Sequence, residues 1–373
     1  MNIQMTKRLL LAVLSSSLFG LPSYAQILIG QTAGFTGAVG ANVKETAEGA
    51  QLYIDSVNAS GGVAGQQIKI IALDDKFDVK LAAENARILI EEKQVVALFL
   101  NRGTPHTEAI LPLLKKYGIA LVAPSTGAML LHKPVNRYVF NVRSSYQREA
   151  EKAVAHLLSM GLQRIAVVHV DDSFGNDALV GADAGFEKNK IKPIGIFKVD
   201  RDKPSYEVIV PGIVKVNAQA VLWFGSGSAV SNGIKALRAA GSFATVVTLS
   251  NNASEGFIKS LGPLGEGVIV TQVFPSERSG TYALVRQAQD LGKAAGVTKI
   301  SPSMLEGFSG AKVLVEALRR AGKNPSRAQI ILALEGMKKF DLGGLEVGYS
   351  PTDHTGLDFA DLSIIGKDGK FMR

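Results

Sequence analysis

Small polar residues follow five apolar runs of the chain, each at the point where a β-strand would end. They occupy positions 101–105 and 124–127 in the first half of the sequence, and 171–175, 225–228 and 250–252 in the second. Most of these turns lead into a helical pattern, and a helix N-terminus offers free N–H groups and a partial positive charge to a carboxylate or phosphate. Serine, threonine and aspartate are also the preferred helix caps, so any one of these turns can serve the fold alone. Five such turns in two halves favour a ligand cleft between the halves.

Phe174 is the aromatic residue among these turns. Beside Gly175, it could cover a ligand from the second half of the chain. It could equally act as a hydrophobic staple for the helix that follows. Both interpretations stay open at this point.

The elements that must position the turns alternate between strand and helix. Short runs rich in isoleucine, valine and leucine are typical of strands buried on both faces of a parallel sheet. They predict strands at 27–31, 68–74, 95–100, 119–124 and 138–142, and again at 164–170, 194–199, 219–225, 245–250 and 267–273. Amphipathic stretches predict helices at 41–58, 147–160, 174–188, 206–216 and 228–240, then two more after Pro275, with a strand-like tail from Leu345. In such open α/β sheets, ligands bind beyond the carboxyl ends of the strands.

The residue patterns that carry catalysis or metal binding are missing from the sequence. The histidines form no His-x-x-x-His pair, and there is neither a Gly-x-Ser-x-Gly elbow nor a Walker-type phosphate loop. The start of a dinucleotide fingerprint at 225–227 lacks its third glycine, because Val230 occupies that position. The paired acids at 74–75 and 171–172 are more typical of caps and loop charges than of a cation site. We therefore expect no enzymatic activity, no cofactor and no metal.

Composition narrows the class of protein further. A chain of 373 residues with 46% hydrophobic residues is long enough for two packed domains. The formal net charge of +8 is dispersed along the chain, which argues against nucleic-acid binding. The absence of cysteine excludes disulfides, zinc-thiolate sites and a lipid-anchored export signal.

The first 25 residues have the pattern of a secretory signal peptide. Lys7 and Arg8 precede an apolar stretch at 9–21, and a small residue, Ala25, ends the segment. The apolar stretch is short for a bilayer, which needs about 20 residues, although an uncleaved anchor is the alternative. We predict cleavage between Ala25 and Gln26 and release of a soluble protein.

Several motifs together resemble one known family. They are Gly-Ala-Val-Gly at 37–40, Asn-x-x-Gly-Gly-x-x-Gly at 58–65, Leu-Asp-Asp at 73–75, Ala-Pro-Ser at 123–125, Asp-Asp-Ser-Phe-Gly at 171–175 and Asp-Phe at 358–359. The chain resembles the type I periplasmic solute-binding proteins of the branched-chain amino acid (leucine/isoleucine/valine-binding) group. The resemblance covers essentially all of the chain after the signal peptide, and the glycine-rich segment followed by the paired aspartates is its most specific part.

The resemblance implies an α/β fold of two Rossmann-like lobes with parallel-sheet cores, joined by three hinge crossovers. Lobe 1 would comprise 26–145 plus 275–354, and lobe 2 would comprise 146–274 plus 355–373. It also implies a periplasmic receptor that closes on a small-molecule ligand and delivers it to an ABC permease and its ATPase. We expect a monomer. A ligand sensor of the same fold and an exported α/β enzyme are the alternatives.

The family pattern also assigns ligand-binding roles to individual positions. In amino-acid-binding relatives, a hydroxyl residue and a loop together hold the α-carboxylate of the ligand. Thr104 matches the hydroxyl residue, and the segment Ser125, Thr126 and Gly127 matches the loop. Gly127 stands where the relatives have threonine, so Ser125 or Thr126 would supply that hydroxyl here. With their neighbours, the expected ligand-binding residues are Arg102, Gly103, Thr104, Ser125, Thr126, Gly127, Phe174, Ser226, Gly227 and Ser250.

Departures from the family pattern change the expected ligand. Phe174 and Gly227 stand where the relatives have tyrosines, and Ser250 stands where they have the glutamate that pairs with the α-ammonium. A buried ammonium without its carboxylate would be uncompensated. We therefore expect a roomier pocket and a carboxylate ligand that lacks an amino group, such as an aromatic or short organic acid. Arg102 would complement its charge, unless it is simply a solvated loop residue.

Overall fold

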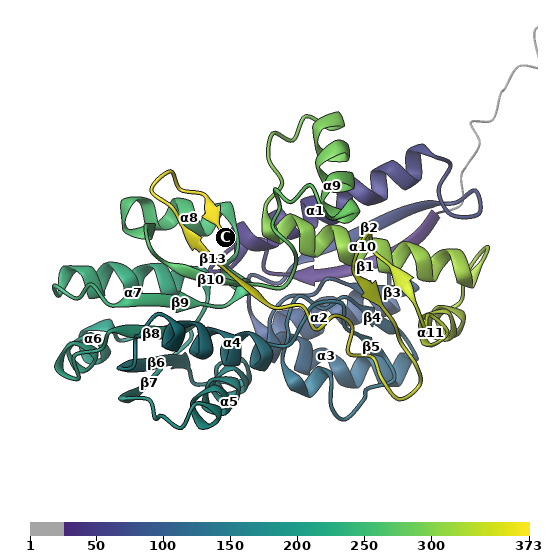
Figure 1. Ribbon diagram of the computed structural model, residues 1–373. Helices are drawn as coiled ribbons and strands as arrows, with labels where there is room; N and C mark the ends of the chain where they lie inside the picture. Colours follow the sequence, from purple (N-terminus) through teal and green to yellow (C-terminus); the bar gives the residue numbers. More distant parts are fainter. Residues whose placement is uncertain (1–25) are drawn as a thin grey trace, which may run out of the picture.

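The computed structural model describes residues 26–373, and the predicted signal peptide with its cleavage site lies outside the described residues. Two separate sheets, each with a core of parallel strands, organise the chain (Figure 1). The first has the order β2-β1-β3-β4-β5, and all of its neighbouring strands are parallel. Its strands are β1 (Gln26–Ala33), β2 (Gln67–Asp74), β3 (Ala97–Phe99), β4 (Ala120–Val122) and β5 (Val139–Phe140).

The second sheet is larger and has the order β14-β13-β10-β9-β8-β6-β7. Its strands are β6 (Ile165–Val170), β7 (Gly195–Val199), β8 (Ala220–Phe224), β9 (Thr245–Thr248), β10 (Ile269–Gln272), β13 (Asp361–Ile365) and β14 (Phe371–Met372). The strands from β6 to β10 pair in parallel, but β13 and β14 form an antiparallel edge. Every strand predicted before position 274 is present. The antiparallel edge was not predicted.

Helices cover the sheets. They are α1 (Gly40–Ala59), α2 (Val79–Glu91), α3 (Thr104–Tyr117), α4 (Tyr146–Ser159), α5 (Ser173–Lys188), α6 (Tyr206–Lys215), α7 (Gly227–Ala239), α8 (Glu255–Leu261), α9 (Ala283–Ala294), α10 (Pro302–Ala321) and α11 (Arg327–Glu335). The helices α1, α4, α5, α6 and α7 follow the predicted amphipathic stretches, whereas no bounds were predicted for α2, α3 and α8. Short 3-10 turns lie at Met129–Leu131, Ser250–Asn252 and Gly262–Gly265, and β11 (Phe340–Asp341) pairs with β12 (Glu346–Val347).

The prediction of two helices after Pro275 is wrong, because the structure has three there: α9, α10 and α11. The last of them is hard to recognise in the sequence. It buries Ile330, Ile331 and Leu334 while Leu332 is 60% exposed, so its apolar residues do not form a single stripe.

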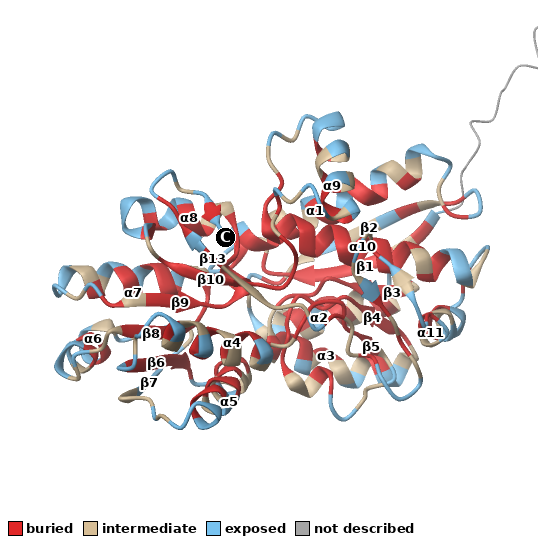
Figure 2. Ribbon diagram, in the orientation of Figure 1, coloured by how far each residue is buried: buried red, intermediate tan, exposed pale blue. Residues whose placement is uncertain are grey.

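Each sheet has its own hydrophobic core, and we call the two bodies the first and second lobes. The first core contains apolar residues from two stretches of the sequence, 27–142 and 273–357, and the second stretch includes α9, α10 and α11. The second core draws on 128–270 and then on Ile365 and Phe371. Figure 2 shows the central strands of both sheets and α10 buried, with exposed residues on edge strands such as β2 and on the outer helices. The exact lobe boundaries stay a prediction.

Close contact between α1 and α10 fixes one wall of the space between the lobes. A Cβ atom on Gly49 would lie 2.0 Å from the carbonyl oxygen of Met304, and one on Gly307 would lie 1.8 Å from that of Thr46. Because no side chain fits at either position, the two helix backbones lie against each other. This packing brings Asn42, in the first turn of α1, within hydrogen-bonding distance of Ser303 on α10.

The chain passes between the lobes three times. The segment between β5 and α4 leads from the first sheet to the second, and the segment between β10 and α9 leads back. The third runs from β12 to β13 and is the long yellow stretch that joins the two halves of Figure 1. Within residues 26–373, no helix has both the length and the apolar character needed to span a membrane.

Candidate ligand-binding site between the lobes

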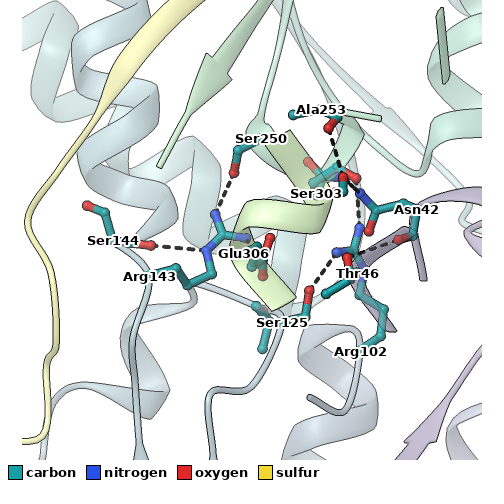
Figure 3. Close-up of polar contacts among 12 residues, drawn as sticks. Asn42, Thr46, Arg102, Ser125, Arg143, Ser144, Ser250, Ala253, Ser303 and Glu306 are labelled. Atoms are coloured by element: carbon teal, nitrogen blue, oxygen red, sulfur yellow. Dashed lines mark hydrogen bonds and ion pairs between the residues drawn. The ribbon is translucent and has the colours of Figure 1, made fainter. Parts of the chain in front are cut away.

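Arg102 is a buried cation that links the two lobes. It follows β3, is only 3% exposed, and forms an isolated parallel bridge with Ser125, which follows β4. Its Nη1 donates to the Ser125 hydroxyl at 2.9 Å, and its Nη2 donates to the carbonyl oxygen of Asn251 in the second lobe at 2.8 Å (Figure 3). Burial lowers the pKa of Arg102 below its ordinary value. Among the described residues, no carboxylate forms an ion pair with it. The alternative of a solvated loop arginine is therefore wrong.

The two turns beside Arg102 begin with strained backbone. Leu100 after β3 and Ala123 after β4 have φ angles of 50° and 51°, in the left-handed region that non-glycine residues rarely adopt. Gly103 has φ 95°, and a Cβ there would lie 2.6 Å from Nδ1 of His106. Strain of this kind clusters at ligand sites, where the surrounding structure must hold it.

Two threonine hydroxyls meet below these turns. Oγ1 of Thr104, at the first position of α3, lies 2.7 Å from Oγ1 of Thr126, and both residues are buried. Gly103 caps α3 without a side-chain hydrogen bond, so the first N–H groups of the helix are free for an acceptor. The pair offers one hydroxyl proton to a ligand oxygen, since the other proton is used between the two hydroxyls.

Replacing both hydroxyls tests this pair. The double variant Thr104→Ala and Thr126→Ala is expected to weaken carboxylate binding by about 10-fold to 100-fold, because the ligand loses a donor and the pocket loses its shape. Isothermal titration calorimetry measures the affinity, and the melting temperature without ligand reports the fold. Unchanged affinity would remove Thr104 and Thr126 from the ligand site.

Aromatic rings close the site from both sides. Phe174 is 6% exposed and contacts Tyr146 edge-on, with ring centroids 4.9 Å apart. In the first lobe, Phe77 stacks on His106 at 4.3 Å, and the Arg201 guanidinium of the second lobe lies 5.1 Å from the Phe77 ring. Arg201 is itself paired with Asp172, through Nε at 2.6 Å.

A narrow cavity of about 20 Å³ lies among these groups. Five of the predicted residues line it: Arg102, Gly103, Thr104, Phe174 and Ser226. Five residues that were not predicted also line it: Val39, Phe77, Tyr146, Arg201 and Asn251. Both lobes contribute, so the cavity is an interface between them. The Arg102–Asn251 hydrogen bond shows that the two lobes contact each other beside this cavity.

A larger cavity of about 360 Å³ continues from the narrow one, since Val39 and Asn251 line both. It lies between the start of α1 and the helices α7 and α8, with Gly227 on one wall and Phe257 on another. A Cβ on Gly227 would lie 3.5 Å from Oδ1 of Asn252, an ordinary van der Waals contact, so this wall could also hold a small side chain.

Two of the predicted turns also cap helices. The Ser226 hydroxyl accepts from the N–H of Ala229 at the start of α7. Asp172 accepts from the N–H groups of Phe174 and Gly175 at the start of α5. These turns therefore do cap helices, which was the alternative to ligand binding. Ser226 caps a helix and also lines the narrow cavity.

A buried ion pair lies behind the site, at the first crossover. Arg143, 1% exposed, pairs with the fully buried Glu149 of α4, and Thr271 of β10 donates its hydroxyl to the same carboxylate. The Arg143 Nη2 donates to the Ser250 hydroxyl at 2.7 Å, and Glu306 of α10 lies 3.9 Å from Nη1 (Figure 3). Burial opposes the charge of Arg143, but its interactions with Tyr146, Glu149 and Glu306 raise its pKa above the ordinary value.

Comparison with known proteins identifies the family. A family model described as "Periplasmic binding protein" matches residues 26–361, which is most of the chain. The chain belongs to the periplasmic binding protein family. A Leu/Ile/Val-binding protein homolog of Brucella melitensis is 23% identical over 93% of the chain and 94% of its own length. A solved structure of a possible leucine/isoleucine/valine-binding protein from Rhodopirellula baltica aligns with a TM-score of 0.85 and 25% identity, over 94% of this chain and 96% of that one.

Another curated relative matches only in part. The amino acid binding protein of Pseudomonas aeruginosa is 22% identical over 60% of this chain, and the match spans 61% of that relative's length. The family and these relatives are binding proteins and not enzymes, as the sequence predicted, and membership places this periplasmic binding protein in the periplasm.

Four predicted residues line neither cavity of this periplasmic binding protein: Ser125, Thr126, Gly127 and Ser250. Ser125 and Thr126 still contact the cavity residues Arg102 and Thr104.

Gly127 and Ser250 instead serve the crossover. A Cβ on Gly127 would lie 2.6 Å from the carbonyl oxygen of Ser144, so a threonine has no room there. Ser250 faces Arg143, and its N–H donates to Glu149 at 2.9 Å. The internal ion pair of Arg143 and Glu149 therefore lies beside Ser250, the position at which the family pattern has a glutamate.

The periplasmic binding protein also has a buried acid beneath the Phe77 loop. Asp75 is fully buried and accepts from the N–H of Phe77 at 2.9 Å and from the Thr32 hydroxyl at 3.1 Å. Loss of hydration on burial, reinforced by Asp74 and Asp78, raises the pKa of Asp75 to about 6.

This raised pKa predicts how an Asp75→Asn variant depends on pH. The folded state binds a proton more tightly than the unfolded state, so the charged form destabilises the fold above pH 6, while below about pH 4 both states are protonated. The replacement side chain keeps an acceptor oxygen without the charge, so the variant is expected to gain up to about 2–3 kcal/mol at pH 7.5 and little at pH 4. Urea titrations at both pH values measure this, and an equal effect at both would contradict the raised pKa.

Proposed function

We propose that this protein captures a small, carboxylate-bearing ligand between its two lobes in the periplasm and delivers it to an ABC importer. The observation that supports this most strongly is Arg102, a buried cation at the junction of the lobes with no carboxylate partner among residues 26–373. Burying an unpaired charge is costly, and a ligand carboxylate would remove that cost.

The charges around the two cavities support an anionic ligand. Arg102 and Arg201 line the narrow cavity and Lys235 lines the larger one, whereas no aspartate or glutamate lines either. The acids near this region are paired within the protein. Asp172 pairs with Arg201, and Arg143 pairs with both Glu149 and Glu306. The free N–H groups at the start of α3 add a further attraction for an anion.

The same contacts explain how a ligand would close the lobes. Arg102 belongs to the first lobe but donates to Asn251 in the second. A carboxylate held by Arg102 and Thr104 would also contact the groups that the second lobe brings to the narrow cavity. Because it would bind the closed form better than the open form, the ligand would shift the population toward closure. We propose that a membrane permease, driven by a cytoplasmic ATPase, recognises the closed, ligand-bound form.

Two of the named relatives are described as a homolog of, or a possible, leucine/isoleucine/valine-binding protein, but we propose a different ligand for this chain. No acid lines the cavities to pair with an α-ammonium group, and the unpaired charge of Arg102 would repel it. An organic or aromatic acid without an amino group suits these surroundings better than a branched-chain amino acid.

A thermal-shift screen tests the proposed function. Butyrate, benzoate, phenylacetate, succinate and leucine are each added to the purified protein over a range of concentrations. We expect one or more of the amine-free carboxylates to raise the melting temperature in a saturable way, because a ligand that binds only the folded state stabilises it. Stabilisation by leucine alone, at micromolar concentration, would contradict the proposed ligand class.

We also propose that the signal peptide is removed after Ala25. N-terminal sequencing of the exported protein should begin at Gln26, and retention of the segment would support the alternative of an uncleaved anchor.

A further inference from the structure

Two asparagines that line the larger cavity each have a buried side-chain oxygen without a partner among the described residues. Asn42, in the first turn of α1, is 5% exposed, and Asn251, after β9, is 6% exposed. Within the part of the chain that the structure describes, neither Oδ1 atom accepts a hydrogen bond. A buried acceptor without a donor is unfavourable, so each oxygen is a position that a ligand donor could satisfy.

The orientation of the Asn42 amide follows from its neighbours. The Ser303 hydroxyl donates to the carbonyl oxygen of Ala253 at 2.8 Å, so this hydroxyl can only accept from Asn42. Accordingly, Nδ2 of Asn42 donates to Ser303 at 2.6 Å, and Oδ1 is the atom left over (Figure 3). Exchanging the two amide atoms would place two acceptors against each other.

Asn251 is fixed by the same reasoning. Its Nδ2 donates to the carbonyl oxygen of Gly225 at 2.9 Å, and a carbonyl oxygen can only accept. Its Oδ1 is therefore the free acceptor. The main-chain carbonyl of Asn251 accepts a hydrogen bond from Arg102. Asn251 therefore contacts the proposed carboxylate-binding residue and also carries one of the free amide oxygens.

The charges around the two cavities indicate whether the ligand group that donates to these oxygens is charged or neutral. The cations Arg102, Arg201 and Lys235 line the two cavities, and no acid does. An ammonium group would meet repulsion from these cations and only neutral oxygens to compensate it. A neutral N–H group, such as that of a carboxamide, satisfies the same oxygens without bringing a positive charge.

We infer that the ligand carries a neutral N–H donor close to its carboxylate, held by Oδ1 of Asn42 and Asn251, with an acyl group in the larger cavity. This inference rests on the proposed function, because it takes the carboxylate at Arg102 as given. The larger cavity, about 360 Å³, has Phe257, Val39 and Gly227 among its walls, which suits an acyl chain or ring. N-acyl amino acids have this arrangement of groups.

Matched ligand pairs test the N–H directly in the unmodified protein. N-acetylglycine and levulinate differ only in an NH group replaced by CH₂, as do N-benzoylglycine and 3-benzoylpropionate. Calorimetry should show at least one amide binding about tenfold or more tightly than its keto partner, since the keto acid leaves the asparagine oxygens unpaired. Keto acids that bind as tightly as the amides would overturn the inference and leave the proposed function intact. If other carboxylates bind but neither amide does, the inference is also overturned.

A variant assigns the effect to Asn42. In Asn42→Ala, the advantage of the amide over its keto partner should fall at least about threefold, whatever the affinity of the variant for the keto acid itself. Asn176→Ala, at an exposed position on α5, is the matched control and should keep the full advantage. An undiminished advantage in a folded Asn42→Ala protein would show that this oxygen does not accept the N–H. If no carboxylate of any kind binds the unmodified protein, the proposed function and the inference both fail.

Discussion

Replacing Arg102 with methionine is expected to weaken carboxylate binding by at least about 100-fold. The guanidinium is buried at the junction of the lobes and donates to Ser125 and Asn251. Charge-assisted hydrogen bonds contribute about 1.5–3 kcal/mol each, and a factor of 100 corresponds to about 2.7 kcal/mol. Methionine fills much of the same space without the charge. Calorimetry with the carboxylate that gives the largest thermal shift measures the loss.

The ligand-free protein should tolerate this change. Removing Arg102 costs two hydrogen bonds to neutral oxygens but also removes a buried charge that has no partner carboxylate, so the two effects offset each other. Arg137→Met is the matched control, because the Arg137 side chain is 64% exposed and lines neither cavity. Equal affinity in the Arg102→Met and Arg137→Met proteins would rule out Arg102 as the carboxylate partner.

Replacing Glu149 with leucine should destabilise the protein by about 3–5 kcal/mol, the largest stability effect we expect. Glu149 is fully buried and compensates Arg143, and it accepts from the N–H of Ser250 and the hydroxyl of Thr271. Removing one member of a buried ion pair leaves the other charge uncompensated. A urea titration measures the free energy of unfolding.

Two further variants separate the ion pair from other effects. Glu151→Leu on the same helix removes a pair with the largely exposed Lys188 and should change stability by less than about 1 kcal/mol. The double variant Arg143→Met and Glu149→Leu should recover much of the loss, because no buried charge is left unpaired. A double variant as unstable as Glu149→Leu alone would show that the charge of Arg143 is not the cause.

Most of the fold could be predicted from the sequence because its signals are local. Runs such as 165–170 are buried at every position, as expected of strands covered on both faces, and the helix at 40–59 has a clear apolar stripe. The antiparallel edge of β13 and β14 could not be predicted this way. Strand direction is set by which sheet the returning chain joins, and no local pattern carries that information.

The site was predicted in part, for a similar reason. Arg102, Thr104 and Ser226 lie in turns directly after strands, where a parallel sheet gathers its ligand groups. Arg201 also follows a strand, β7, but its turn is charged and has no glycine or hydroxyl cluster to draw attention to it. Tyr146 and Asn42 reach the site only because a crossover and the packing of α1 on α10 bring them there.

The crystal structure of the protein with its strongest-binding carboxylate tests the central claim most directly. The account predicts one ligand between the two lobes, with a carboxylate oxygen within about 3 Å of the Arg102 guanidinium and of the Thr104 hydroxyl. A ligand bound outside the interface of the lobes, or one between them with its carboxylate turned away from Arg102, would contradict it.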